Sequence, residues 1–210
     1  MNNTLINSNS VTYKEKRSQF IGYSKSIKII SDVNSFVKTL RLKHPSSRHI
    51  CWAYRVYNND KIIENCTDAG EPSGSAGLPI LNTIKHRNIV NCSIFIVRYF
   101  GGVKLGKQGL INAYKTTANL VIAEGVLQKW VPKSQYQINA SIKYFGKIAN
   151  IVKQNDGNII SDMTIENLNL LIELPIDNYY DFKVEFDEIT QNSGNIKKQS
   201  EHDQTKEVRK

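Results

Sequence analysis

The pattern of apolar and polar positions in the first 130 residues predicts strands that alternate with helices. After a polar leader, residues 18–30 carry the apolar side chains of a strand, and residues 32–43 place apolar side chains at helical spacing. Two further strand-like runs, 50–57 and 61–67, flank an Asn-Asn-Asp sequence at 58–60, a composition suited to a hairpin turn. The sequence therefore predicts a mixed α and β domain.

The chain after Pro132 has a different pattern and is predicted to form a second domain. Its expected elements are a strand at 135–141, a helix at 144–154, strands at 159–166 and 168–174, and a helix that begins at Pro175 or Asp177. This β-α-β-β-α order is one strand short of a ferredoxin-like unit. A closing strand would lie near 194–198, where the only apolar residue is an isoleucine. We expect domains over 1–132 and 133–198, and a disordered polar tail over 199–210.

Two glycine-rich loops stand out in the first domain. The first, D-A-G-E-P-S-G-S-A-G-L-P at 68–79, is dominated by small residues, contains two prolines and continues into a short helix at 78–85. The second follows a strand-like run at 94–100 and ends where an apolar-periodic helix is predicted to start, at Gly109. Because each loop follows a strand and precedes a helix, we expect the two to lie side by side.

The second loop has the features of an anion site. Its glycines, which allow positive φ and close approach of a ligand, are Gly101, Gly102, Gly106 and Gly109. The unpaired amides and the dipole of the following helix would also favour an anion. The nearby cations are Arg98, Lys104 and Lys107. The alternative is a tight strand-to-helix connection that needs glycine for packing alone.

Residues 101–108 of this loop read G-x-x-x-x-G-K-Q, which matches a phosphate-binding P-loop except at its last position. Gln108 stands where a P-loop has the Ser or Thr that holds magnesium. No later apolar strand ends in an acidic residue that would hold the metal from a second side. Both departures argue against nucleotide hydrolysis.

The first loop carries two carboxylates, Asp68 and Glu71. Together with Ser73 and Ser75 they could hold a metal ion or act as acid and base. The alternative is helix capping, in which Asp68 or one of the serines accepts hydrogen bonds from amides of the next helix. Asp68 and Glu71 are the only catalytic candidates that the sequence offers.

The cysteines give no sign of a disulfide or metal site. Cys51, Cys66 and Cys92 lack a C-x-x-C spacing and lie in apolar runs, so we expect reduced, mostly buried thiols. His49 and Cys51 share one face of a predicted strand, but no further ligands stand at the spacing of a zinc site. We expect no metal and no cofactor.

The composition is that of a globular protein. The chain has 210 residues, 40% hydrophobic and 22% charged. It contains no run of roughly 18 apolar residues, the length that a membrane helix needs. Its first residues lack the basic and apolar regions of a signal peptide. We expect a cytoplasmic protein that does not enter membranes.

The positive charge is concentrated in the first domain. Up to Pro132 there are 18 Lys and Arg against 7 Asp and Glu, a net charge of +11, whereas the rest has 10 against 12, or −2. Such asymmetry favours an anionic partner for the first domain, nucleic acid being the commonest. Cations scattered over a solvated surface would give the same count.

The two loops and their flanking strands resemble the signature of the IMPACT/YigZ family. The matching segments are His44-Pro45, H-I-C-W-A-Y-R at 49–55, D-A-G-E-P-S-G-S-A-G-L-P-I-L at 68–81, V-R-Y-F-G-G-V-K-L-G at 97–106, Gly109-Leu110 and Ala113-Tyr114. The resemblance covers the first 130 residues. The order of elements in the second domain is similar to the carboxy-terminal domain of the bacterial YigZ branch.

The resemblance implies an α+β fold, with a first domain like the second domain of small-subunit ribosomal protein five and a ferredoxin-like second domain. It also implies a translation-associated regulator that binds RNA, a ribosome or a translation factor through the basic first domain. The rival hypothesis is an enzyme that acts on a small phosphorylated or otherwise anionic ligand in a pocket between the loops. The candidate ligand-binding residues are His49, Asp68, Glu71, Ser73, Gly74, Ser75, Arg98, Tyr99, Gly101, Gly102, Lys104, Gly106 and Gly109.

Overall fold

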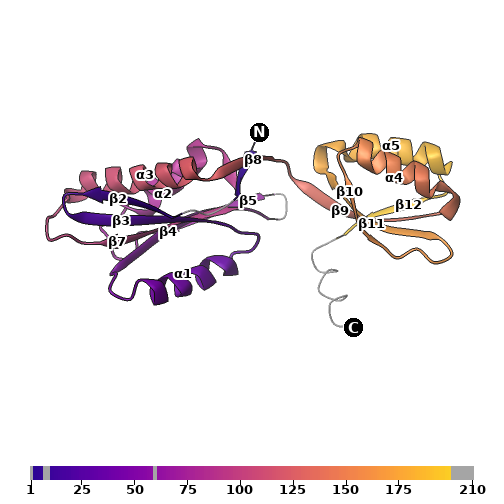
Figure 1. Cartoon of the computed structure of the whole chain (residues 1–210). Helices are drawn as coiled ribbons and strands as arrows, with labels where there is room; N and C mark the ends of the chain where they lie inside the picture. Colours follow the sequence, from indigo (N-terminus) through magenta and orange to yellow (C-terminus); the bar gives the residue numbers. More distant parts are fainter. Residues whose placement is uncertain (1, 7–9, 59–60, 200–210) are drawn as a thin grey trace. The chain divides into compact units, whose positions relative to one another are not determined.

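The computed structural model describes residues 2–6, 10–58 and 61–199, which fall into two compact units (Figure 1). The division lies between Trp130 and Val131, close to the boundary expected after Pro132. The amide of Gln199 still donates to the carbonyl of Gln135, and the remainder of the tail predicted to be disordered lies outside the described residues.

A five-stranded antiparallel sheet forms the centre of the first unit. Its strands, in spatial order, are β2 (Val11–Glu15), β3 (Ser18–Ser26), β7 (Cys92–Tyr99), β4 (His49–Asn58) and β5 (Lys61–Thr67). The predicted hairpin is confirmed, because β4 and β5 are consecutive in the chain and pair antiparallel.

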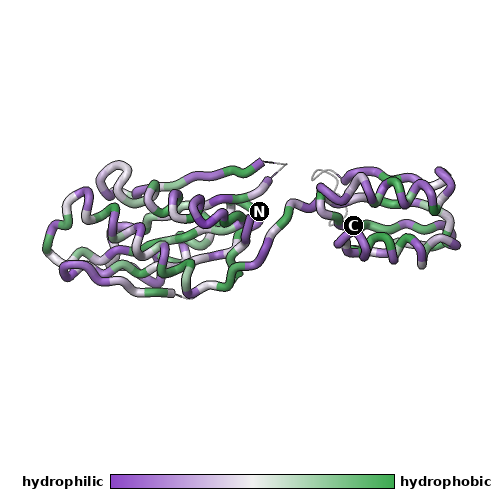
Figure 2. The backbone as a smooth tube through the Cα atoms, turned by 90° about the horizontal axis from the view of Figure 1, so that it is seen from above, coloured by the Kyte–Doolittle hydropathy of each residue, from purple (hydrophilic) through white to green (hydrophobic). Residues whose placement is uncertain are grey.

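Helices cover both faces of this sheet (Figure 1). The first face is covered by α1 (Ser31–Lys43), whose Val33 and Leu40 pack on the strands. The other face is covered by α2 (Gly77–His86) and α3 (Gly106–Glu124). Side chains alternate between the two faces along each strand, so neighbouring residues of β7 belong to different cores. Hydrophobic and hydrophilic residues also alternate along the helices (Figure 2). This is expected of helices that bury one face and expose the other.

The polar leader contributes strands to the fold, which the sequence did not predict. It contains β2 and also β1 (Asn2–Ile6), which lies between β6 (Ile89–Val90) and β8 (Val126–Trp130) in a separate three-stranded sheet. Leu5 in β1 is buried in the core beneath α2 and α3. Backbone pairing on both sides compensates for the low apolar content of this strand.

The second unit has the ferredoxin-like arrangement. Its antiparallel sheet has the order β10 (Asn158–Asp162), β11 (Leu168–Pro175), β9 (Lys133–Ala140), β12 (Asn195–Lys198). Its helices are α4 (Phe145–Gln154) and α5 (Tyr179–Thr190), preceded by the short 3-10 helices η1 (Ile142–Tyr144) and η2 (Ile176–Asn178).

The closing strand of this unit forms despite its single isoleucine, because Ile196 pairs opposite the buried Ile138 of β9. The strand predicted over 159–166 is shorter than expected. It ends at Asp162, whose carboxylate accepts a hydrogen bond from the amide of Thr164 and turns the chain.

Among the described residues, no helix combines the length and the apolar character needed to cross a bilayer.

Candidate functional site

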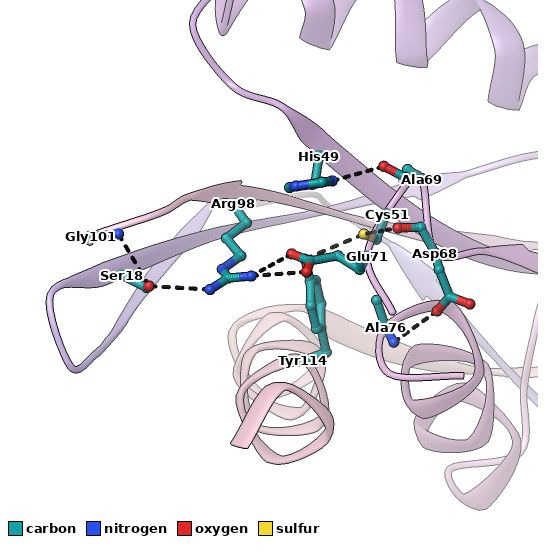
Figure 3. Close-up of polar contacts among 10 residues, drawn as sticks. All are labelled: Ser18, His49, Cys51, Asp68, Ala69, Glu71, Ala76, Arg98, Gly101 and Tyr114. Atoms are coloured by element: carbon teal, nitrogen blue, oxygen red, sulfur yellow. Dashed lines mark hydrogen bonds and ion pairs between the residues drawn. The ribbon is translucent and has the colours of Figure 1, made fainter. Parts of the chain in front are cut away.

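The two glycine-rich loops meet at one end of the five-stranded sheet, as the sequence predicted (Figure 3). Arg98, at the end of β7, places Nη1 2.8 Å from Oε1 and 2.9 Å from Oε2 of Glu71 in the first loop. Both side chains are buried, with 7% and 3% of their areas exposed. The loops are therefore joined by a buried ion pair.

A buried chain of polar contacts continues from this ion pair. The hydroxyl of Tyr114, on α3, donates to Oε1 of Glu71 at 2.8 Å. The Cys51 thiol on β4 lies 3.3 Å from that hydroxyl and 3.0 Å from the carbonyl oxygen of Asp68. Strand β4, strand β7, helix α3 and the first loop are thus held together by one network (Figure 3).

This network keeps its thiol and phenol protonated. Burial raises the pKa of Cys51 to about 12, and burial also raises the pKa of Tyr114 above its ordinary value of 10.0. A nucleophilic cysteine needs a lowered pKa, because the thiolate is the reactive form. Cys51 therefore has the properties of a structural residue.

Asp68 caps helix α2. Its Oδ1 accepts hydrogen bonds from the amides of Ala76 at 2.9 Å and Gly77 at 2.8 Å, and its Oδ2 accepts one from Gly74 at 2.8 Å. Burial alone would raise the pKa of this carboxyl, but the three amides outweigh it and hold the pKa below 3.8. The structure therefore bears out helix capping for Asp68.

The two serines of the first loop do not share this capping role. Ser73 is exposed, and Ser75 is fully buried. Within the described part of the chain, the hydroxyl of Ser75 has no hydrogen-bond partner. Of the three residues that could have capped α2, Asp68 is the one that does so.

The second loop begins with a glycine that packing requires. A Cβ on Gly101 would lie 2.0 Å from the carbonyl oxygen of Arg17, and the Gly101 amide donates to Oγ of Ser18 at 3.3 Å. The Gly101 amide is therefore used inside the protein and is not available to an anion in this loop. Gly102 has a different role, because its φ of +83° favours glycine although open space surrounds it.

Helix α3 begins earlier than predicted. Its first residue is Gly106, with φ at +71°, so Gly109 lies inside the first turn and not at the helix start. Apolar periodicity could not find this start, because the first turn, G-K-Q-G, has no apolar residue. Lys104 and Gly106 are exposed beside the helix start.

Two residues predicted to lie in the site, Tyr99 and His49, are on strands and not in the glycine-rich loops. Tyr99 points to the α1 face of the sheet, away from Arg98, and its hydroxyl lies 2.9 Å from Nδ1 of His44. Its inclusion with the loops was wrong, because adjacent strand residues face opposite sides. His49, the first residue of β4, contacts the first loop, since its Nδ1 lies 2.9 Å from the carbonyl oxygen of Ala69.

The pocket that we expected between the loops is filled, at the level of the ion pair, by Glu71 and Arg98 themselves. A cavity of about 630 Å³ lies instead between α2 and α3. Its lining is Gly74, Leu78, Pro79, Asn82, Thr83, His86, Arg87, Ile111, Lys115 and Asn119. Gly74, Leu78 and Pro79 belong to the first glycine-rich loop, but the lining contains no residue of the second, and the sequence did not predict this cavity.

Comparison with known proteins identifies the family. The family model for the Impact N-terminal domain matches residues 16–122, which include both loops and the ion pair. The chain belongs to the IMPACT/YigZ family. It is 28% identical over 196 residues to the IMPACT family member YigZ of Escherichia coli, a match that covers 92% of this chain and 96% of YigZ.

Two more relatives extend this result. The IMPACT family member YvyE of Bacillus subtilis is 32% identical over 141 residues, covering 67% of this chain and 64% of YvyE, so the match spans slightly less than two thirds of that relative. A crystal structure described as a hypothetical protein is similar with a TM-score of 0.67 and 27% identity, over 96% of this chain and 99% of that one. This chain therefore shares its α+β fold with that protein over both units.

Proposed function

We propose that this protein is a translation-associated regulator that binds RNA or a ribosomal partner through its first unit. The proposal follows from membership in the IMPACT/YigZ family and from the net charge of +11 up to Pro132. We place this role in the cytoplasm, where the free thiols of Cys51, Cys66 and Cys92 would stay reduced.

The observation that supports this proposal most directly is that both carboxylates of the first loop already have partners. Three backbone amides and the nearby charge of Lys107 stabilise the Asp68 carboxylate, and Arg98 forms an ion pair with Glu71. The exposed Lys104 and Lys107 therefore face solvent beside carboxylates that already have partners. This end of the first unit offers cations to an anionic partner, as RNA binding requires.

The rival function has one specific observation in its favour. The cavity between α2 and α3 has the volume of a small-molecule site, and its rim carries His86, Arg87 and Lys115 without a carboxylate in the lining. A small phosphorylated ligand would suit the charges of Arg87 and Lys115 and the ring nitrogens of His86, which can form hydrogen bonds. In this alternative the site would lie between α2 and α3, beside the first glycine-rich loop, and not between the two loops.

Titration of the whole protein distinguishes the two functions. We expect single-stranded RNA to bind with an affinity that falls as salt rises, since phosphate contacts release counterions. Changing both Lys143 and Lys147 to Gln, on exposed positions of the second unit, should leave this binding unchanged. Absence of RNA binding at low salt would contradict the RNA-binding form of the proposal.

The rival is tested with inorganic phosphate and nucleoside monophosphates. If these bind and the double change Arg87→Gln, Lys115→Gln abolishes their binding, the cavity is a ligand site. If wild-type protein binds RNA and none of the small phosphates, the cavity is not a ligand site and the enzyme hypothesis is contradicted.

A further inference from the structure

Two exposed basic residues, Lys16 and Arg17, form the turn between β2 and β3. Their φ angles are 42° and 68°, so both have the left-handed conformation. Two-residue turns with this backbone usually contain Asn or Gly, because other side chains disfavour it. Strained backbone of this kind points to a use for the side chains it displays.

The second glycine-rich loop holds this turn in place. Gly101 packs so closely on the backbone of Arg17 that no side chain fits between them, and its amide donates to Ser18, the first residue after the turn. Figure 3 shows Ser18 and Gly101 next to each other at the end of the hairpin, with Arg98 beside Ser18. Turn and loop therefore form one exposed tip.

An exposed aromatic ring belongs to the same tip. Phe100, directly before Gly101, is 55% exposed. The guanidinium carbon of Arg98 lies 5.4 Å from the centre of its ring and 5.5 Å from the centre of the buried Phe20 ring. Glu71 holds the guanidinium of Arg98 in place. The ring of Phe100 therefore packs against a fixed cation, while much of the surface of Phe100 faces solvent.

We propose that this tip, formed by Lys16, Arg17, Phe100 and Lys104, binds single-stranded RNA. An unpaired base stacks on Phe100, and the three cations contact the neighbouring phosphates. Exposed aromatic rings beside cations are how proteins bind single strands without reading their sequence. The proposal rests on the proposed function and adds to it the form of RNA and the residues that contact it.

Single-stranded RNA suits this tip better than a duplex or an acidic peptide. Bases within a duplex are already stacked on both sides and cannot reach a protruding ring. An acidic peptide would satisfy the cations but leave the face of Phe100 without a flat partner. Glu15, the carboxylate next to the turn, already accepts a hydrogen bond from the Tyr13 hydroxyl at 2.7 Å.

The test measures the affinity of the whole protein for a single-stranded RNA of about 12 nucleotides, which is within the usual site size. The same measurement is made with a duplex of the same sequence. Phe100→Leu keeps an apolar side chain and removes the ring. It should weaken single-strand binding about 5- to 100-fold, the value of one stacked base, and leave duplex binding unchanged. Phe100→Trp should retain binding, and Phe145→Leu, which changes another half-exposed phenylalanine, should have no effect.

A second pair of measurements addresses the turn. Changing Lys16 and Arg17 to Gln should flatten the slope of log affinity against log salt by about 1.4, since each single-strand phosphate contact contributes about 0.7. The Phe100→Leu slope should equal that of the wild type, because stacking releases no counterions. Thermal unfolding of each variant checks that the fold is intact.

Several results would overturn this assignment. If wild-type protein binds RNA and Phe100→Leu binds it equally well, the tip is not the contact while the proposed function stands. Equal losses for single strand and duplex, or equal losses in Phe100→Leu and Phe100→Trp, would rule out stacking. Tighter binding of an oligo-glutamate peptide than of RNA would make the tip a protein-binding site. If no RNA binds at any salt concentration, this assignment is wrong, and so is the RNA-binding form of the proposed function.

Discussion

Arg98 and Glu71 form a two-oxygen ion pair, at 2.8 and 2.9 Å, that connects the first glycine-rich loop to the strand leading into the second. Tyr114 adds a third contact to the carboxylate. Buried pairs of this kind gain little net energy over apolar packing, yet losing one partner is costly because the other charge stays buried. The pair therefore fixes the relative positions of the loops.

The first prediction concerns this pair. Glu71→Gln should lower the free energy of unfolding by about 3 kcal/mol, because the Arg98 charge remains buried without its counterion. Urea denaturation measures the change. Glu64→Gln is the matched control: Glu64 contacts Arg55 and Lys85 at a more exposed position, and its loss should cost less than about 1 kcal/mol. Equal effects of the two changes would contradict a special role for the buried pair.

The second prediction concerns the cap of α2. Asp68→Asn should destabilise the protein by about 1 to 2 kcal/mol at neutral pH, since Asn keeps the shape but loses the charge that three amides stabilise. Because the pKa of Asp68 is lowered from 3.8, its contribution is complete above pH 3.8 and is lost as the pH falls through the folded value. Urea midpoints of wild type and variant should therefore converge at acid pH. A constant difference down to about pH 2 would contradict this.

The third prediction concerns His44, which lies between two tyrosines on the α1 side of the sheet. Its Nε2 is 2.8 Å from the Tyr23 hydroxyl and its Nδ1 is 2.9 Å from the Tyr99 hydroxyl. Burial, and secondarily the charge of Lys43, lower its pKa below 6.5. The unfolded chain then takes up the proton first, so stability is complete above pH 6.5 and declines as the pH falls below it.

The variant His44→Gln removes this titration while it retains a donor and an acceptor. Its stability, measured by urea unfolding between about pH 7 and pH 5, should change less than that of the wild type. His86→Gln, at an exposed position, serves as the control and should follow the wild type. A steeper decline in His44→Gln than in the wild type would refute the argument.

Local chemistry was sufficient to predict the two loops and their meeting. Each loop stands out by its small residues, and the shared order of strand, loop and helix placed them at the same edge of the sheet. The partners that complete the site were not predictable, because Ser18 lies 80 residues from Arg98 and Tyr114 lies 43 residues from Glu71. Neither residue belongs to a local pattern that indicates such a contact.

Other features that the sequence did not predict have local causes. The turn at Lys16 and Arg17 lacks the Asn or Gly that marks a two-residue hairpin, so the strand before it was read as a polar leader. Strand β1 has two apolar residues, Leu5 and Ile6, and forms because backbone partners lie on both sides. The P-loop likeness of residues 101–108 could not reveal that the Gly101 amide is bonded to a serine from another strand.

The fourth prediction concerns salt. If RNA contacts the second loop, changing Lys104 and Lys107 together to Gln should flatten the slope of log affinity against log salt by about 1.4. The double change of Lys143 and Lys147 removes the same charge from the second unit and should leave the slope unaltered. Fluorescence anisotropy with labelled single-stranded RNA gives both slopes. An unchanged slope in the first variant would move the contact to another surface of the unit.

The last prediction separates two glycines that are adjacent in the sequence. Gly101→Ala would place a methyl group 2.0 Å from the Arg17 carbonyl oxygen, an overlap that only movement of the turn can relieve. Gly102→Ala meets no neighbour and retains only the cost of a positive φ, about 1 kcal/mol. We therefore expect Gly101→Ala to be the more destabilising by about 1 to 3 kcal/mol in urea unfolding.

The amide chemical shifts of the Gly101→Ala variant, measured by NMR, should change at Lys16 and Arg17, whereas those of Gly102→Ala should change only near the substitution. If Gly101→Ala also weakens single-strand RNA binding and Gly102→Ala does not, the position of the turn matters for binding. Unchanged Lys16 and Arg17 signals in Gly101→Ala would mean that the loop does not hold the turn.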